Sequence, residues 1–161
     1  MKKLERECKM KKRWLLALVF TCLLFVPRLV FAVDFDILSY KGDLNIHADN
    51  TAVFKETITY HFKDDFNGQL IGLGKAGKMP NGFEIDDEPT VLVSKNGQIV
   101  QDVLSYTKEE EDGYKVTIFN PGKTGDTVRV TVTWQLKNLL FLYQDIAELN
   151  WQPLTDSSGN I

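Results

Sequence analysis

The sequence predicts an all-β protein: a two-sheet antiparallel β-sandwich, immunoglobulin-like in general architecture, preceded by a signal-peptide helix. Three observations support this class. Apolar and polar residues alternate along most of the chain after residue 32, as they do in strands with one buried face. Turn-forming pairs such as Asn96-Gly97 and Pro121-Gly122 separate the alternating runs. No stretch after residue 32 has a convincing amphipathic helical period, so a parallel sheet built from βα units is excluded.

The segment 1–32 has the layout of a secretory signal peptide. A basic stretch ends at Arg13, an uncharged run covers 14–26, and Pro27-Arg28 then breaks it. Val30 and Ala32 stand at the two positions that a signal peptidase reads, and we expect cleavage after Ala32. The uncharged run is shorter than the roughly 20 residues that span a bilayer. The alternative is an uncleaved N-terminal anchor.

The net charge of −3 over 161 residues conceals two regions of opposite sign. Segment 1–32 holds eight of the 19 basic residues and two of the 22 acidic ones, so 33–161 carries a net charge of −9. Such an acidic domain lacks the clustered basic surface that a nucleic-acid binder needs. Cys8 and Cys22 both fall in the expected signal peptide. The exported domain therefore has no disulfide, thiol nucleophile or cysteine-ligated zinc, and its hydrophobic core must stabilise it.

The first part of the domain contains three alternating runs. Residues 35–37 and 44–46 are short runs on either side of a predicted turn at 41–43 (Lys-Gly-Asp). The run 54–62 is the clearest, with apolar residues at its even positions apart from Glu56. A carboxylate on the apolar face of a strand has to lie at a rim or be paired with another group.

The second part of the domain contains a hairpin and two further runs. Asn96-Gly97 follows the run 91–93 and predicts a tight hairpin, because this pair accepts the positive φ angles of a primed turn. Alternation resumes over 114–118 and 128–136, which brings the total to about seven strands. Residues 138–151 lack strict alternation, and a short strand and one or two helical turns both remain open.

The glycine-rich segment 67–82 is the best candidate for a binding edge. Residues 72–77 (Gly-Leu-Gly-Lys-Ala-Gly) have the spacing of a dinucleotide-binding loop, but Pro80 and Gly82 would stop the helix that this motif requires. We expect a long loop between strands, because loops of this length are uncommon without a function. The candidate interaction residues are Asn67, Gly68, Gly72, Gly74, Lys75, Gly77 and Lys78. The alternative is a surface loop that packs its apolar residues onto the core.

No catalytic, cofactor or metal site is predicted. The acidic clusters at 64–65, 86–88 and 109–112 do not have the spacing of an EF-hand, and adjacent carboxylates in turns are usually solvated. His47 and His61 are the only histidines, and no nucleophile elbow accompanies them. We therefore expect a protein that is not an enzyme.

The tryptophans raise one alternative, a sugar-stacking platform made by Trp134 and Trp151. Trp134 shares the parity of Val130 and Val132, which favours a position in the core. Exposure of either indole beside a carboxylate would favour the platform.

Three segments carry a family resemblance by their order and spacing. They are 42–62, which ends in Phe-Lys-Glu-Thr-Ile-Thr-Tyr-His-Phe, then the turn 66–68 (Phe-Asn-Gly), and 146–151 (Ile-Ala-Glu-Leu-Asn-Trp). Together they resemble the bacterial predicted membrane proteins grouped as domain of unknown function 2207, over roughly 35–154. The resemblance implies a β-sandwich ectodomain behind a signal peptide, and it implies no catalytic residues.

Two departures from the family pattern limit what the resemblance implies. Members often carry an arginine between the Phe-x-Gly turn and a proline, whereas no arginine occurs between Lys63 and Pro80. Members also continue for several hundred residues into further ectodomain and membrane-spanning helices. We therefore expect 33–161 to be C-terminally incomplete relative to the family, as a truncated product or a fragment.

These observations predict an uncharacterised extracytoplasmic module of a membrane-anchored bacterial protein, acting in interaction or sensing. The expected partner is a protein or another component of the cell envelope, with the membrane reached through the signal segment or a missing C-terminal anchor. We expect an exported protein on the outer side of the cell membrane, or a secreted one if the fragment is expressed alone. The alternative function is a cell-surface carbohydrate-binding or hydrolytic domain.

Overall fold

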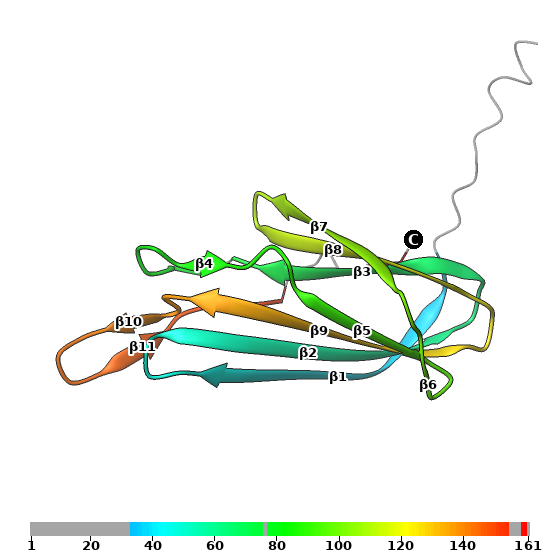
Figure 1. Cartoon of the computed structure of the whole chain (residues 1–161), viewed down its shortest axis with the longest axis horizontal. Coiled ribbons are helices and arrows are strands. Elements are labelled where there is room, and N and C mark those ends of the chain that lie inside the picture. The colour runs from blue at the N-terminus through cyan, green and yellow to red at the C-terminus, as the bar shows by residue number, and fades with distance from the viewer. Residues whose placement is uncertain (1–32, 76, 155–158, 161) are drawn as a thin grey trace, which may run out of the picture. The chain divides into compact units, whose positions relative to one another are not determined.

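The computed structural model describes residues 33–75 and 77–154, and the backbone of 159–160 (Figure 1). The predicted signal peptide and its helix lie outside these residues. The described part contains twelve strands and no helix, and all strand pairs in it are antiparallel. This confirms the all-β antiparallel class, with more strands than the sequence predicted.

Six strands form the largest sheet, in the order β1-β2-β9-β5-β6, with β4 beside β5 on the same edge of β9. Its strands are β1 (Phe35–Ile46), β2 (Thr51–Phe62), β4 (Glu84–Ile85), β5 (Thr90–Lys95), β6 (Gln98–Ile99) and β9 (Thr127–Lys137). Four strands form a second sheet in the order β12-β3-β8-β7, namely β3 (Phe66–Gly74), β7 (Leu104–Glu110), β8 (Gly113–Gly122) and β12 (Gly159–Asn160). The remaining two, β10 (Leu140–Leu142) and β11 (Ala147–Leu149), pair only with each other.

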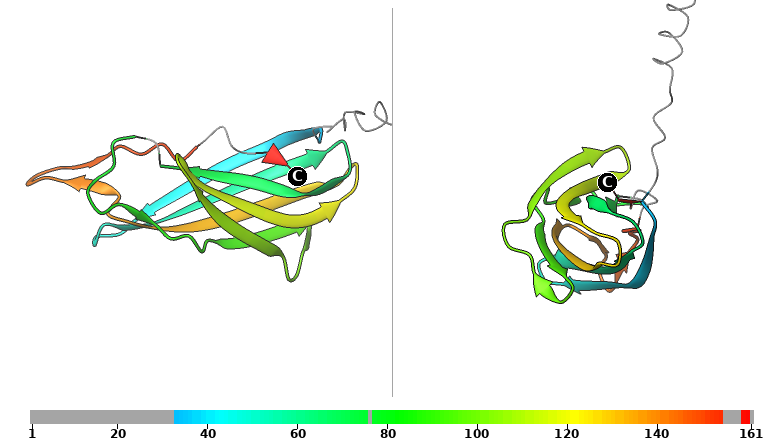
Figure 2. Two further views of the ribbon diagram at one scale, coloured as in Figure 1. Left: turned by 90° about the horizontal axis from the view of Figure 1, so that it is seen from above. Right: turned by 90° about the vertical axis from the view of Figure 1, so that its right-hand side faces the viewer.

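One hydrophobic core draws on buried residues of both larger sheets. In the end view of Figure 2 the ribbons of the two sheets lie on opposite sides of the space between them. In β9 the even positions from Val128 to Leu136 are buried, whereas Arg129 and Gln135 are exposed. In β2 the even positions from Ala52 to Phe62 are buried in the same way. The alternation along these two central strands thus produces the buried face that their sequence predicts, although Thr59 of β2 is buried as well.

The predicted turn at 41–43 is wrong, because β1 runs without a break through Gly42. Gly42 lies opposite Glu56, and both neighbours keep the same register with β2. The ring of Phe54 and the hydroxyl of Tyr40 fill the space where a Cβ on Gly42 would project. The glycine therefore accommodates packing beneath a continuous strand, and the chain turns only at 47–50.

The predicted loop over 67–82 is also wrong in its first half, because Phe66–Gly74 is the mostly buried strand β3. A Cβ on Gly68 would collide with the backbone oxygen of Ile118 on β8. Glycine is needed here because two strands approach each other closely. From the sequence alone, the same glycine is equally well explained by a loop.

The two hairpin regions behave differently. The predicted hairpin at Asn96-Gly97 is confirmed, with φ angles of 51° and 81° and strands β5 and β6 on either side. In 138–151, where strand and helical turns remained open, the chain forms the β10–β11 hairpin. This hairpin extends beyond the end of β2 and β9 in Figures 1 and 2.

Candidate functional site

The seven candidate interaction residues do not gather in one place. Asn67, Gly68, Gly72 and Gly74 belong to β3, and only Asn67 among these four is exposed. Lys75, Gly77 and Lys78 follow the other end of the strand. The three buried glycines lie within the sheet and offer no side chain to a partner. The remaining residues fall at two ends of β3, and each end has its own surroundings.

At the C-terminal end of β3, Lys75 is already paired. Its ammonium contacts the carboxylate of Glu109 and lies 4.5 Å from the centroid of the Tyr114 ring. Lys78 is more exposed, with its Nζ 5.8 Å from the centroid of the Phe141 ring on β10. These cations pack over aromatic rings, which stabilises the connection between β3 and the neighbouring hairpins.

At the N-terminal end, Asn67 borders an open hollow of about 420 Å³. The hollow is lined by Asp65, Lys95, Lys123 and Asp126 together with 66–67 and 121–122. It therefore has two carboxylates and two ammonium groups on its wall. Its four charges come from the β2–β3 turn, the end of β5 and the β8–β9 turn.

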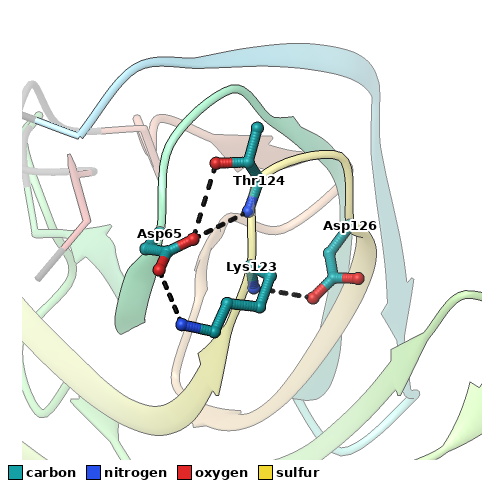
Figure 3. Close-up of polar contacts among 4 residues, drawn as sticks. All are labelled: Asp65, Lys123, Thr124 and Asp126. Atoms are coloured by element: carbon teal, nitrogen blue, oxygen red, sulfur yellow. Dashed lines mark hydrogen bonds and ion pairs between the residues drawn. The ribbon is translucent and has the colours of Figure 1, made fainter.

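Hydrogen bonds connect the β2–β3 turn to the β8–β9 turn beside this hollow (Figure 3). Lys123 Nζ donates to Asp65 Oδ2 at 2.7 Å, and the backbone N–H of Thr124 donates to Asp65 Oδ1 at 3.1 Å. Within the β8–β9 turn, the backbone N–H of Lys123 donates to Asp126 Oδ2 at 2.8 Å. These bonds fix the β8–β9 turn against the β2–β3 turn.

The β5–β6 hairpin joins the same network through Asn96. Asn96 Nδ2 donates to Asp126 Oδ1 at 2.7 Å, and Asn96 Oδ1 accepts the backbone N–H of Thr127 at 2.9 Å. Lys95 Nζ donates to the carbonyl of Pro121 at 2.7 Å. Three turns from different parts of the chain are thus held together at this end of the domain.

Electrostatics keep both carboxylates of the hollow ionised. The hydrogen bond from the Lys123 side chain lowers the pKa of Asp65, and the backbone hydrogen bond from Lys123 lowers the pKa of Asp126. A general acid or base for neutral pH needs a pKa near 7, and these groups are shifted the other way. Because hydrogen bonds join three turns around it, we call this hollow the polar junction.

A second polar cluster lies inside the core around Glu56. The Glu56 side chain is 2% exposed, and its Oε1 accepts a 3.1 Å hydrogen bond from Trp134 Nε1. Its Oε2 accepts a 3.4 Å hydrogen bond from the hydroxyl of Tyr40. Of the two expectations for Glu56, a rim position or pairing with another group, the structure shows pairing. Its two hydrogen bonds join β2 to β9 and to β1.

Burial raises the pKa of Glu56 to about 7, although the two hydrogen bonds oppose this rise. The buried hydroxyl of Tyr60 has no hydrogen-bond partner among the described residues. Burial, and secondly the charge of Glu56, raise the pKa of Tyr60. A carboxyl with a pKa near 7 has the acidity of a general acid, but Glu56 is enclosed in the core.

Neither tryptophan presents an open stacking platform. Trp134 is 0% exposed, which confirms its predicted core position. Trp151 is half-buried, donates a 2.8 Å hydrogen bond from Nε1 to the carbonyl of Gly74, and packs edge-on against Phe54. Both indoles therefore stabilise the domain in the positions where the structure places them.

The described residues hold neither a cluster of metal ligands nor a helix suited to span a membrane. Within 33–154, apart from residue 76, no three or more His, Cys, Asp or Glu side chains cluster as metal ligands would. The same described residues include no helix with the length and apolar character of a membrane span.

The outer face of the four-stranded sheet carries an exposed apolar patch of Leu104, Tyr106 and Phe119. They are 73%, 54% and 46% exposed, and the rings of Tyr106 and Phe119 have centroids 6.0 Å apart. Leu104 lies directly opposite Phe119 across the β7–β8 pair, while Ile118 points into the core. Sequence reasoning missed this patch; the available signal was that residues 118 and 119, on opposite faces of one strand, are both apolar.

Comparison with known proteins identifies one family. The family model described as "Predicted membrane protein (DUF2207) N-terminal domain" matches residues 36–159. Neither the curated proteins nor the solved structures include a match to this chain. The matched residues span β1 to β12, and so include the Glu56 cluster, the polar junction and the apolar patch. The chain belongs to the DUF2207 family of predicted membrane proteins.

Proposed function

We propose that 33–161 is an extracytoplasmic β-sandwich module of a membrane-anchored protein, and that it acts in interaction or sensing without catalysis. The family's description as predicted membrane proteins supports an association with the membrane. The signal-like segment 1–32 supports export, and the net charge of −9 beyond it argues against nucleic acid as a partner. The membrane would be reached through the signal segment or a C-terminal anchor.

The observation that carries the interaction role is the patch of Leu104, Tyr106 and Phe119. Three large apolar side chains adjoin one another on the outer face of a sheet, where water contact costs free energy. Clustered exposed apolar residues that include aromatics are typical of surfaces that bind partners. The partner is a protein or another apolar component of the cell envelope.

The experiment is site-specific cross-linking in cells that express the full chain. A photoreactive amino acid replaces Tyr106 in one variant and Arg129, an exposed residue of the other sheet, in a second. We expect a discrete product at position 106 and none at 129. Leu104→Asp should abolish that product, whereas Ile99→Asp, which changes an equally exposed residue of β6, should leave it. Identical products at both positions, or no product at 106, would contradict the proposal.

The carbohydrate-binding or hydrolytic alternative is not supported by a specific observation. Its most direct requirement is an indole face open beside a carboxylate, and Trp134 and Trp151 are both engaged in packing and hydrogen bonds. Binding of cell-wall glycans by the full chain, lost on substitution of Trp151, would favour this alternative.

A further inference from the structure

Strand β1 forms one edge of the six-stranded sheet (Figure 1). Only Phe35 and Leu44 in this twelve-residue strand are half-buried, and its other residues are exposed. In the part of the chain that the structure describes, no strand pairs with its outer side. A long edge of this kind presents unpaired backbone N–H and C=O groups to any strand of suitable register.

The residues on either side of Gly42 have side chains that match when one strand is paired with an inverted copy of itself. If two copies of β1 pair antiparallel with Gly42 opposite Gly42, Lys41 of each copy lies opposite Asp43 of the other. In the same register Tyr40 lies opposite Leu44, and Ser39 opposite Asn45. Every charge then meets its opposite and every apolar residue meets an apolar one, which are the favourable cross-strand pairs of antiparallel sheets.

The two faces of the strand agree with this register. Tyr40 and Leu44 lie opposite Ile58 and Phe54 of β2, both buried, so the new apolar pairs would extend the core-facing side of the sheet. Lys41 and Asp43 lie opposite Thr57 and Lys55, on the solvent-facing side.

The features that protect β1 from other strands do not exclude a second copy. The irregularity in its pairing lies between Ile37 and Ser39, outside the central stretch 39–45. In a single chain, Lys41 Nζ bonds Asp43 Oδ2 at 2.9 Å. Self-pairing exchanges the two intrachain contacts, one in each copy, for two equivalent contacts across the interface. The charges therefore contribute specificity mainly by penalising other strands, whose sequences would leave Lys41 or Asp43 facing an unsuitable residue.

We propose that β1 pairs antiparallel with β1 of a second copy over Ser39–Asn45, with the two-fold axis at Gly42, to join the two six-stranded sheets into one. The pairing uses a different surface from the patch of Leu104, Tyr106 and Phe119. It does not depend on the proposed function, and either can fail without the other.

Charge-reversal variants of the full chain test the pairing. With Lys41→Asp, the aspartate introduced in each copy lies opposite Asp43 of the other, on either side of Gly42. With Asp43→Lys, the same two positions hold lysines opposite each other. Each variant alone should self-associate roughly tenfold more weakly than the unchanged chain or worse, because like charges directly opposite destabilise a strand pair. An equimolar mixture should recover association, since each Asp then faces a Lys. Analytical ultracentrifugation in a mild detergent measures all four samples.

The recovery in the mixture separates loss of pairing from loss of folding, because a misfolded variant would not be rescued by another. A monomeric unchanged chain at the concentrations tested would overturn the proposal. So would single variants that associate as well as the unchanged chain, or a different protein found bound along β1.

Disulfide trapping tests the register. In a full chain with Cys8→Ser and Cys22→Ser, Ser39→Cys and Asn45→Cys are co-expressed on differently tagged copies. Oxidation should join the two tags, while each variant alone should give no cross-link, because identical positions lie six residues out of register. A cross-link in Ser39→Cys alone would indicate parallel pairing or an antiparallel pairing in another register, and either would contradict the inference.

Discussion

Trp134 donates its indole hydrogen to the buried carboxylate of Glu56, across 78 residues of sequence, at 3.1 Å. The bond joins the two central strands of the large sheet, β2 and β9, on the face that lines the core. Tyr40 adds a second hydrogen bond from the edge strand β1. A polar group on a buried face is stable only when it is bonded, so this cluster ties three strands in one arrangement.

Replacing Glu56 tests the cluster. Glu56→Ala leaves the indole N–H of Trp134 without its acceptor and opens a cavity, and we expect a loss of about 2–4 kcal/mol in the free energy of unfolding. Glu56→Gln keeps an acceptor for Trp134 and should cost less than about 1.5 kcal/mol. Urea denaturation at pH 6 measures both. Equal losses in the two variants would contradict a role for the hydrogen bond.

The dependence of stability on pH should reveal the buried carboxyl. The pKa of Glu56 is raised from 4.5 to about 7 on folding, so the folded state binds more protons between these values. Its contribution to stability is therefore fully present below pH 4.5 and is lost as the pH rises through 7, by at most roughly 3 kcal/mol. Glu56→Gln cannot titrate and should lack this component.

The measurement is the unfolding free energy of both proteins from pH 5 to pH 8. The difference between them should shift in favour of Glu56→Gln as the pH rises. A difference that stays constant across this range would show that Glu56 does not titrate within it.

Gly68 should tolerate no side chain. Gly68→Ala would place a Cβ against the backbone oxygen of Ile118, and we expect a loss of about 3 kcal/mol or more, or a failure to fold. The matched control is Gly97→Ala, where nothing lies near the added Cβ and only the positive φ of 81° is unfavourable. That variant should lose about 1–2 kcal/mol. Thermal unfolding monitored by circular dichroism compares the two, and similar losses would contradict the close approach of β3 and β8.

Asn96 combines two contributions that variants can separate. Asn96→Ala loses the hydrogen bonds with Asp126 and Thr127 and also strains the φ of 51°, so we expect a loss of about 2 kcal/mol. Asn96→Gly loses the same bonds but accepts the positive φ, and should lose about 1 kcal/mol less. If both variants unfold with equal free energy, backbone strain contributes nothing at this turn.

Local patterns in the sequence were sufficient for the central strands. The alternation along β9 and the second half of β2 records one buried and one exposed face, which requires no knowledge of the partner strand. The Asn96-Gly97 turn was also predictable, because the φ angles it needs are properties of the two residues themselves.

Features that depend on distant partners were not predictable. Gly68 reads as a loop residue until Ile118, 50 positions later, is known to lie against it. Gly42 suggests a turn in the sequence, and only the structure shows that β2 pairs with the residues before and after it in one register. Glu56 stood out by its parity, but its partner Trp134 could not be named, since any of several distant side chains offers a donor. The burial of Gly68, Gly72 and Gly74 within β3 could not be predicted for the same reason.

The proposed function requires that this domain lie outside the cytoplasm. Full chains with Cys8→Ser and Cys22→Ser carry one new cysteine, either Glu111→Cys in the exposed β7–β8 turn or Val130→Cys in the core. Intact cells are treated with a membrane-impermeant thiol reagent. We predict that Glu111→Cys reacts in intact cells and that Val130→Cys reacts only after denaturation. Labelling of Glu111→Cys only after the cells are lysed would contradict the proposed location, and with it the function assigned to the domain.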